Sequence, residues 1–359
     1  MEFLKNTLKL RGLPDESGMA DGDVCINPDA ARHLFAKCPV AAVSPLHDVS
    51  KIAEQLGVSA FHVKDERGRM GLGSFKSLGA AFAIAKAADK VVSDSTLNFA
   101  EALAGRTYVC ASAGNHGLSM AAGARVFGAN AVVYLSSAVP QEFADRLTAQ
   151  GATVVRAGDT YEKSVDAALA AAKDNGWELL SDSSWEGYSQ MPRDVMEGYL
   201  IMGAEVADQL KLPPTHIFLQ AGVGGLAAAC AAAARHYWGG EPKIYVVEPE
   251  YAPALFDSVK AARVVTAQGS VSKMGRLDCK EPSHLALKYL AKEADGFITI
   301  TEDESRVAAA DLEAHGLLAS PSAAAGYSGV LCAGPKRDKM ELTSESRILI
   351  YLTEGAIDE

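Results

Sequence analysis

The stretch Gly71-Leu72-Gly73-Ser74-Phe75-Lys76-Ser77-Leu78-Gly79-Ala80 joins a short apolar run, residues 60–63, to an alanine-rich helix that we expect to open near Ser77. Because glycines loosen the turn before this helix, the side chain of Lys76 can reach into a cleft instead of out into solvent. A lysine amine held in a cleft is what an enzyme needs to form a Schiff base with a carbonyl cofactor. Taken alone, this stretch is weak evidence for a Schiff-base lysine, since most lysines before a helix are solvated. Motifs further along the chain decide whether the interpretation holds.

Outside this stretch, short apolar runs alternate with alanine-rich helical stretches almost throughout the chain. Strands are predicted at residues 107–110, 131–135, 153–155, 216–219, 244–247, 297–300 and 348–352, with helices such as 117–126, 161–172 and 226–237 between them. Strands that are apolar on both faces and alternate with helices are typical of parallel sheets covered by helices on both sides. The sequence therefore predicts an α/β protein.

The length of 359 residues exceeds that of one ordinary core, so two domains or one large α/β unit are expected. Residues 89–182 contain a compact set of strands and helices that predicts a small inserted domain. Residues 1–88 and 183–359 would then form a large cofactor-binding domain around a second sheet. About 25 residues at the start of the chain are expected to be a loosely packed arm or part of an oligomer contact.

The composition narrows the classes of function. A formal net charge of −11 argues against binding to a phosphate backbone, which relies on basic patches, but permits a local site for a small anion. The six cysteines are scattered without metal-ligand spacing, so we expect no metal site and no disulfides. The sequence has no signal-peptide core and no apolar run of membrane-spanning length. We therefore expect a cytoplasmic protein that binds neither nucleic acid nor membranes.

A second motif, Ala111-Ser112-Ala113-Gly114-Asn115-His116-Gly117, follows the strand predicted at residues 107–110 and opens a helix rich in small residues. Backbone amides at the N-terminus of a helix make a site for an anion of carboxylate size. The side chain of Asn115 adds a neutral amide donor to this site. An ordinary strand–turn–helix unit would look the same, so the motif carries weight only together with the others.

A third motif, Gln220-Ala221-Gly222-Val223-Gly224-Gly225-Leu226, also follows a strand and opens an apolar helix. Glycine amides around a helix N-terminus bind phosphate, which makes this motif the stronger of the two anion sites. A nucleotide-dependent oxidoreductase remains an alternative. Glu248 follows the next predicted strand, much as the ribose-binding acid of a Rossmann fold does.

A hydroxyl residue, Thr353, follows the last predicted strand, at the edge of a parallel sheet where ligands bind. The lysine, the two glycine motifs and this threonine together match the requirements of pyridoxal phosphate (PLP). That cofactor needs an amine for its aldehyde, a site for its phosphate, a donor to its phenolic oxygen and a partner for its ring nitrogen. The sequence therefore predicts a PLP enzyme.

The chain also resembles, nearly end to end, the tryptophan synthase β-like (fold-type II) family of PLP enzymes, and within it the diaminopropionate ammonia-lyases. Besides the Lys76 stretch, the resemblance rests on Val63-Lys64-Asp65-Glu66, Gly114-Asn115-His116-Gly117, Trp185-Glu186-Gly187-Tyr188, Met196-x-Gly198-Tyr199, Gly222-Val223-Gly224-Gly225 and Thr353-Glu354-Gly355. It implies a homodimer with the cofactor in the cleft between two domains. It also implies an α,β-elimination that converts a small β-substituted amino acid into a 2-oxo acid and ammonia.

The resemblance implies a role for each motif residue. Lys76 would hold the cofactor and remove the Cα proton, and Asp182 would act beside the substrate as a second catalytic group. The cofactor would further be bound by Asn115, Gly222, Val223, Gly224, Gly225 and Thr353. The substrate would be bound by Ser112, Ala113, Gly114, His116 and Arg276.

Two features depart from the ammonia-lyase pattern. Ala113 stands where those enzymes carry an aspartate that acts on the substrate, and a later loop gains positive charge at Lys273, Arg276 and Lys280. Either the loop is solvent-exposed and has drifted, or the substrate carries an anionic β-substituent instead of a cationic amine. A β-replacement synthase that shares the first half-reaction and a cofactor-binding protein without turnover also remain alternatives.

Overall fold

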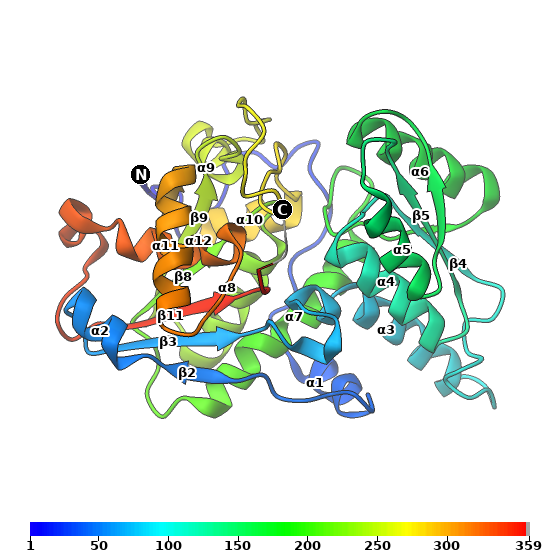
Figure 1. Ribbon diagram of the computed structural model, residues 1–359, viewed down its shortest axis with the longest axis horizontal. Coiled ribbons are helices and arrows are strands. Elements are labelled where there is room, and N and C mark those ends of the chain that lie inside the picture. Colours follow the sequence, from blue (N-terminus) through cyan, green and yellow to red (C-terminus); the bar gives the residue numbers. More distant parts are fainter. Residues whose placement is uncertain (357–359) are drawn as a thin grey trace.

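The computed structural model describes residues 1–356, which form two parts that lie side by side, each built on a sheet (Figure 1). The larger sheet has the strand order β1-β10-β9-β8-β11-β3-β2. Its strands are β1 (Glu2–Lys5), β2 (Leu46–Asp48), β3 (Ala60–Asp65), β8 (His216–Gln220), β9 (Lys243–Pro249), β10 (Gly296–Ile300) and β11 (Arg347–Leu352). The inner strands pair in parallel, and β1 and β2 are antiparallel edges.

The smaller sheet has the order β6-β5-β4-β7, and all its pairs are parallel. Its strands are β4 (Thr107–Cys110), β5 (Asn130–Leu135), β6 (Thr153–Arg156) and β7 (Glu178–Leu179). The chain thus enters this sheet after β3 and returns to the larger sheet at β8. Two mostly parallel sheets confirm the predicted α/β class, while the domain boundaries at residues 88/89 and 182/183 stay a prediction.

Helices cover both sheets. Helices packed with the larger sheet include α1 (Asp29–Ala36), α2 (Ser50–Leu56), α7 (Gln190–Gln209), α8 (Gly225–Trp238), α9 (Ala254–Ala261), α10 (His284–Glu293), α11 (Glu302–Ala314) and α12 (Pro321–Leu331). Those around the smaller sheet are α3 (Ala80–Ser93), α4 (Asn115–Val126), α5 (Gln141–Ala149) and α6 (Tyr161–Asn175). Short 3-10 turns are η1 (Arg69–Gly71), η2 (Phe75–Leu78), η3 (Gly334–Lys336) and η4 (Asp338–Met340). Within residues 1–356, no helix has the length and apolarity that a bilayer crossing needs.

Small side chains explain how tightly these layers pack. Residues 227–234, in the middle of α8, are at most 1 % exposed, and seven of these eight residues are alanine. On the facing helix α7, a Cβ atom built at Gly203 would lie only 2.4 Å from Cβ of Ala233. The alanine and glycine enrichment of the chain therefore reflects helices in close contact rather than low complexity.

The expectation of a loosely packed N-terminal arm was wrong for residues 1–6, and the alternative, an oligomer contact, stays a prediction. Strand β1 pairs along its whole length with β10, and Asn6 donates side-chain hydrogen bonds of 2.8 Å to the carbonyls of Ala291 and Ala294. Phe3 packs edge-on against Tyr245, with ring centroids 6.1 Å apart. A four-residue edge strand with charged ends has too short a pattern to be recognised, and its partner lies nearly 300 residues away.

Candidate active site

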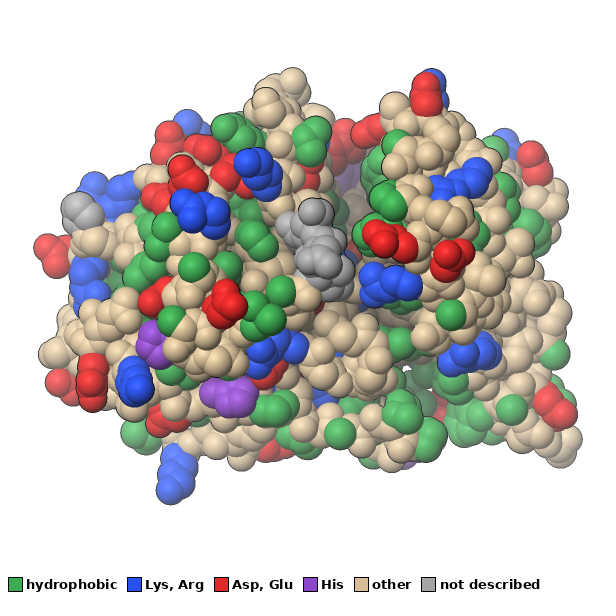
Figure 2. All heavy atoms as spheres, viewed as in Figure 1, with side chains coloured by type: hydrophobic (Ala, Val, Ile, Leu, Met, Phe, Trp, Pro, Cys, Tyr) green, Lys and Arg blue, Asp and Glu red, His purple; other side chains and the backbone are tan. Residues whose placement is uncertain are grey.

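A cavity of about 450 Å³ lies between the two parts, where the surface is hollowed in Figure 2. It is bordered by the C-terminal ends of β4, β8 and β11 and by the first turns of α4 and α8. This is the edge at which open parallel sheets bind ligands. The structure brings every predicted site residue to it: Lys76, Ser112, Ala113, Gly114, Asn115, His116, Asp182, Gly222, Val223, Gly224, Gly225, Arg276 and Thr353. The roles of these residues stay predictions.

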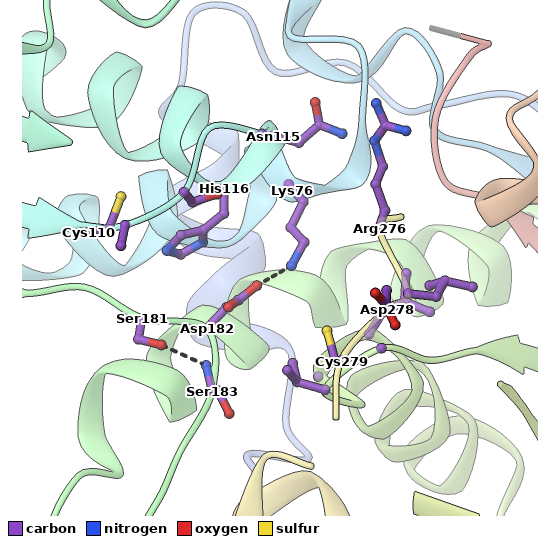
Figure 3. A pocket seen from close by; sticks show the side chains of 18 of the residues that line it. Lys76, Cys110, Asn115, His116, Ser181, Asp182, Ser183, Arg276, Asp278 and Cys279 are labelled. Carbon is purple, nitrogen blue, oxygen red and sulfur yellow. Dashed lines mark hydrogen bonds and ion pairs between the residues drawn. The ribbon is translucent and has the colours of Figure 1, made fainter. Parts of the chain in front are cut away.

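Lys76 and Asp182 face each other in this cavity and form an ion pair (Figure 3). Both side chains are about 24 % exposed, because they open into the cavity. Burial raises the pKa of the Asp182 carboxyl, but the Lys76 ammonium outweighs burial and holds that pKa below its usual range. Burial likewise lowers the pKa of Lys76, and the Asp182 carboxylate more than reverses this, so its pKa is raised. Both groups are therefore charged at neutral pH.

The turn that carries Lys76 is η2, and α3 begins at Ala80 rather than near Ser77 as expected. The Ser77 hydroxyl donates to the carbonyl of Ser74 at 2.8 Å, and the Phe75 amide donates to the carbonyl of Thr353 at 3.1 Å. The turn is thus joined to the end of β11. These bonds replace the first helical turn and hold the lysine at the cavity.

A buried network of charges lies behind this turn. Arg69, in η1, binds Glu66 at 2.7 Å and Glu205 at 2.7 Å, and Lys64 binds Glu205 at 2.6 Å. Exposure is 2 % for Arg69, 0 % for Glu66 and Lys64, and 6 % for Glu205. The two cations and two carboxylates balance, which makes their burial tolerable. The network fixes η1, and Ser77 of η2 reaches back to it with a hydrogen bond of 3.4 Å to the Arg69 carbonyl.

Glu205→Gln is expected to lower the free energy of unfolding by about 3–5 kcal/mol, because it leaves two buried cations with one carboxylate. Urea denaturation measures this loss. The matched control is Glu178→Gln, which breaks the ion pair between Glu178 and Arg106. The side chain of Arg106 is 37 % exposed and that of Glu178 is 28 % exposed. The control should cost at most about 1 kcal/mol, since exposed pairs contribute little. Equal losses in both variants would contradict the role given to the buried network.

The second motif lies at the start of α4. Asn115 donates through Nδ2 to Oε2 of Glu354 at 2.6 Å, across the cavity from the start of α4 to the end of β11. A Cβ atom at Gly117 would lie 2.1 Å from the carbonyl oxygen of Ser112, so the tight turn requires glycine there. The amides of this first helical turn lack intrahelical partners, as an anion site requires.

His116 lies buried in the wall of the cavity. It is 5 % exposed, and its Nε2 lies 2.8 Å from the carbonyl oxygen of Leu180. That oxygen can only accept, so Nε2 carries the proton. Burial lowers the pKa of His116, which is therefore neutral. The imidazole supports the wall behind Asp182 in this structure, and its predicted contact with substrate stays a prediction.

The third motif forms the N-terminus of α8. Gly224 has φ of +100°, which only glycine adopts without strain. A Cβ atom at Gly222 would lie 3.0 Å from Sγ of Cys279 and 3.2 Å from the carbonyl oxygen of Arg276. The missing side chain therefore lets another loop close over the helix end. With the helix dipole behind it, this cradle suits a phosphate.

Thr353 follows β11 and is 5 % exposed. Its hydroxyl oxygen accepts from Nε2 of Gln220 at 3.3 Å, which leaves its own proton to donate into the cavity. Such a donor suits an unprotonated ring nitrogen. No role was predicted for Gln220, although it begins the third motif at the end of a strand, where a side chain meets the ligand edge of the sheet.

Glu354 is another residue that sequence reasoning missed. It is 2 % exposed, and its Oε1 accepts from the Ser320 hydroxyl at 2.9 Å. Its Oε2, already bonded to Asn115, also accepts from Nε of Arg276 at 2.9 Å. Figure 3 shows Asn115 and Arg276 on the same side of the cavity. Its position next to Thr353, at the end of the last strand, was the feature of the sequence that could have indicated its place in the site.

Of the three positive residues in the loop before α10, Arg276 lines the cavity and Lys273 and Lys280 do not. Lys273 is exposed. Lys280 donates to the carbonyls of Tyr251 at 2.7 Å and Ser270 at 2.9 Å and binds Asp278, so it holds the loop together. Any positive charge that the loop offers to a ligand therefore comes from Arg276, while Asp278 of the same loop also lines the cavity and is bound by Lys280.

Glu248 is not available to a nucleotide. It is 0 % exposed, and its carboxylate accepts from the backbone amides of Leu255 at 2.8 Å and Phe256 at 2.7 Å. It therefore caps α9 instead of facing a ribose. This removes the spacing argument for a Rossmann-type oxidoreductase.

The residues present fit PLP. An amine, a phosphate cradle, an amide donor and a hydroxyl donor line one cavity. Lys76 would hold the cofactor aldehyde, the start of α8 its phosphate, Asn115 its phenolic oxygen and Thr353 its ring nitrogen. The fold and site together define a PLP enzyme of fold type II.

Comparison with known proteins supports the same class of enzyme. The chain belongs to the family described as pyridoxal-phosphate dependent enzymes, which matches residues 39–354. Diaminopropionate ammonia-lyase of Escherichia coli K12 is 31 % identical over 354 residues, covering 91 % of this chain and 88 % of that enzyme. The corresponding Salmonella typhimurium enzyme is 32 % identical over 296 residues, covering 76 % of this chain and 73 % of its own.

Solved structures are similar over almost the whole chain. The E. coli ammonia-lyase in complex with D-serine superposes with a TM-score of 0.88 at 26 % identity, covering 99 % of this chain and 94 % of that one. The structure of the same enzyme in complex with an aminoacrylate–PLP azomethine intermediate superposes with a TM-score of 0.86 at 26 % identity. It again covers 99 % of this chain and 94 % of that one. The predicted family, fold type and cofactor are thereby confirmed.

Proposed function

We propose that this protein catalyses the PLP-dependent α,β-elimination of a small β-substituted amino acid, giving a 2-oxo acid and ammonia. The observation that carries the proposal is the Lys76–Asp182 pair in a cavity that also contains a phosphate cradle. The similar ammonia-lyases, one of them solved with an aminoacrylate intermediate, support the same reaction class.

Different residues of the cavity would act in different steps of the reaction. Bound PLP would supply a sink for the electron pair left at Cα of the substrate. Nζ of Lys76 removes the Cα proton, and the Asp182 carboxylate balances the charge that forms on the lysine. The Ser112 hydroxyl and the first amides of α4 hold the substrate carboxylate. The β-substituent then leaves, and the enamine product hydrolyses in water.

A panel of β-substituted amino acids of both chiralities, assayed for released 2-oxo acid, tests the proposal. Elimination predicts one ammonia, from the α-amine, for each 2-oxo acid, together with the released β-substituent and without a second substrate. When the β-substituent is itself an amine, as in diaminopropionate, two ammonia are expected for each 2-oxo acid. If product forms only when an amine or thiol is added, and is then a new β-substituted amino acid, the protein is a β-replacement synthase and the proposal is wrong.

We further propose that the preferred substrate carries an anionic β-substituent. Ala113 offers no countercharge to a cationic β-amine, whereas the Arg276 guanidinium suits a carboxylate, sulfonate or phosphate. Arg276 is 26 % exposed at the cavity, and Glu354 orients it through Nε. Diaminopropionate, above all its D-isomer, should therefore be a poor substrate.

Arg276→Gln should lower kcat/KM for an anionic substrate by about ten- to a hundredfold, since a charge-assisted hydrogen bond contributes about 1.5–3 kcal/mol. Activity on serine should hardly change. Lys273→Gln removes the same charge from the same loop outside the cavity and should alter neither activity. Equal losses on both substrates in Arg276→Gln, or diaminopropionate as the best substrate, would contradict the charge argument.

We also propose that the protein is a cytoplasmic homodimer acting on a small amino acid, without nucleic-acid or membrane partners. Exposed apolar side chains at Val40 and Val43, 57 % and 63 % exposed, support an oligomer contact near the N-terminal segment. The net charge of −11 supports the lack of a nucleic-acid partner. Analytical ultracentrifugation and cell fractionation test these points.

A further inference from the structure

Tyr199 lines the cavity with Lys76, yet the proposed function gives it no role. It belongs to α7 and is 1 % exposed, and its ring packs against Phe75 with centroids 4.9 Å apart. Within residues 1–356, its buried hydroxyl has no hydrogen-bond partner. Burying an unpaired hydroxyl is costly, so phenylalanine would serve a purely structural role better.

The chain nevertheless makes room for this hydroxyl. Gly79 ends the turn that carries Lys76, and a Cβ atom there would lie 2.6 Å from the Tyr199 hydroxyl oxygen. Any side chain at this position would displace the phenol from the turn. The close approach therefore keeps the hydroxyl beside the residue that holds the cofactor.

The other titratable groups around the Lys76 amine are the Asp182 carboxylate, the buried Cys279 thiol, the neutral His116 ring and the phenol of Tyr161, a residue that is 63 % exposed. Burial raises the pKa of Cys279 to about 12, so the thiol is protonated and offers no charge. Asp182 binds the amine in this structure. Once Lys76 leaves Asp182, the buried neutral acceptors left in this group are the phenol oxygen of Tyr199 and Nδ1 of His116, neither of which has a hydrogen-bond partner within residues 1–356. Of the two, Tyr199 packs its ring directly against Phe75, the residue before Lys76.

We propose that Tyr199 is a positioning residue whose hydroxyl oxygen accepts a hydrogen bond from Nζ of Lys76 during turnover. The inference rests on the proposed function. When the incoming amino acid frees the lysine, Nζ must turn toward Cα of the substrate and take its proton. The bond to Tyr199 holds Nζ in place and favours the protonated lysine that this step produces.

Tyr199→Phe tests the role in the holoenzyme, because it removes the hydroxyl and keeps the ring. Tyr108→Phe is a matched control, since Tyr108 on β4 is 0 % exposed, has an unpaired hydroxyl within residues 1–356 and does not line the cavity. In Tyr199→Phe, kcat should fall about ten- to a hundredfold and KM should change less than about twofold. The pH midpoint of the absorbance of lysine-bound cofactor should fall by about one unit.

Tyr108→Phe should change none of these three quantities, and neither variant should lower the melting temperature. If Tyr199→Phe behaves like Tyr108→Phe in kcat and in the absorbance titration, or if it loses its fold, the hydroxyl is structural and the inference is wrong. Gly79→Ala, which displaces the hydroxyl, should shift the absorbance midpoint in the same direction as Tyr199→Phe. A wild-type protein that takes up no PLP would contradict the proposed function instead.

Discussion

Lys76→Ala is expected to abolish elimination while the protein remains folded. One substitution removes both the amine that holds the cofactor and the base that takes the Cα proton, so the loss should reach or exceed about 10⁴-fold, the upper range for a single base. The fold should survive because Asp182, left without its partner, is 24 % exposed to the cavity, where water can solvate it. Release of 2-oxo acid measures the activity, and circular dichroism and thermal melting report the fold.

Lys86→Ala is the control for this substitution. Lys86 lies on α3, close to Lys76 in sequence, and binds Asp194 and Glu197 outside the cavity. It should keep full activity. Borohydride reduction of the yellow wild-type protein, followed by peptide mapping, should find the cofactor on Lys76. A colourless protein that takes up no PLP, or a label on another lysine, would contradict the assignment.

The fold could be predicted because its signal is local. Strands such as β8 and β11 are short apolar runs, and helices such as α8 follow them at once with small residues at the turn. The order of the strands in the sheet has no such local signal. Strand β11 lies between β8 and β3, and both of these precede it by more than 100 residues in the sequence. That order was not predicted from the sequence, because the local pattern of a strand does not show which distant strand it pairs with.

Most of the predicted site residues share a simple property: they follow a strand or open a helix at the ligand edge of a sheet. Lys76, in η2, and Arg276, in the loop between α9 and α10, are the exceptions. The residues that were missed act through long-range contacts. Glu354 joins Asn115, Arg276 and Ser320, which lie on three separate segments. Tyr199 is set by its approach to Gly79. No spacing in the sequence reveals such contacts, because they exist only once the layers have packed.

Asp182→Asn is expected to lower kcat by about 10²–10⁴-fold and to change the stability little, because the carboxylate acts beside the Cα proton and the leaving group. The structural alternative, that Asp182 caps the segment before Trp185, has weak support. The amide of Ser183 donates to the Ser181 hydroxyl at 3.2 Å, and the amide of Ser184 donates to the Ser283 hydroxyl at 3.1 Å. Serines, not Asp182, therefore hold this segment.

The pH dependence follows from the direction of the two pKa shifts. Because Lys76 lowers the pKa of Asp182, the pair stabilises the fold above the ordinary aspartate pKa of about 3.9 and loses that effect as the pH falls through the folded value. Because Asp182 raises the pKa of Lys76, the effect is complete below about 10.4 and is lost as the pH rises further. Wild-type stability should thus show no transition from this pair between about pH 5 and 9.

Asp182→Asn separates catalysis from stability because it keeps the shape of the side chain and removes its charge. Steady-state kinetics on the best substrate, with urea denaturation at pH 7, should show a large fall in kcat beside a small change in unfolding free energy. Asp194→Asn, which breaks an ion pair with Lys86 outside the cavity, should leave the kinetics unchanged. If Asp182→Asn has wild-type kinetics, or loses stability in proportion to its activity, Asp182 is a structural residue and the proton chemistry belongs to Lys76 alone.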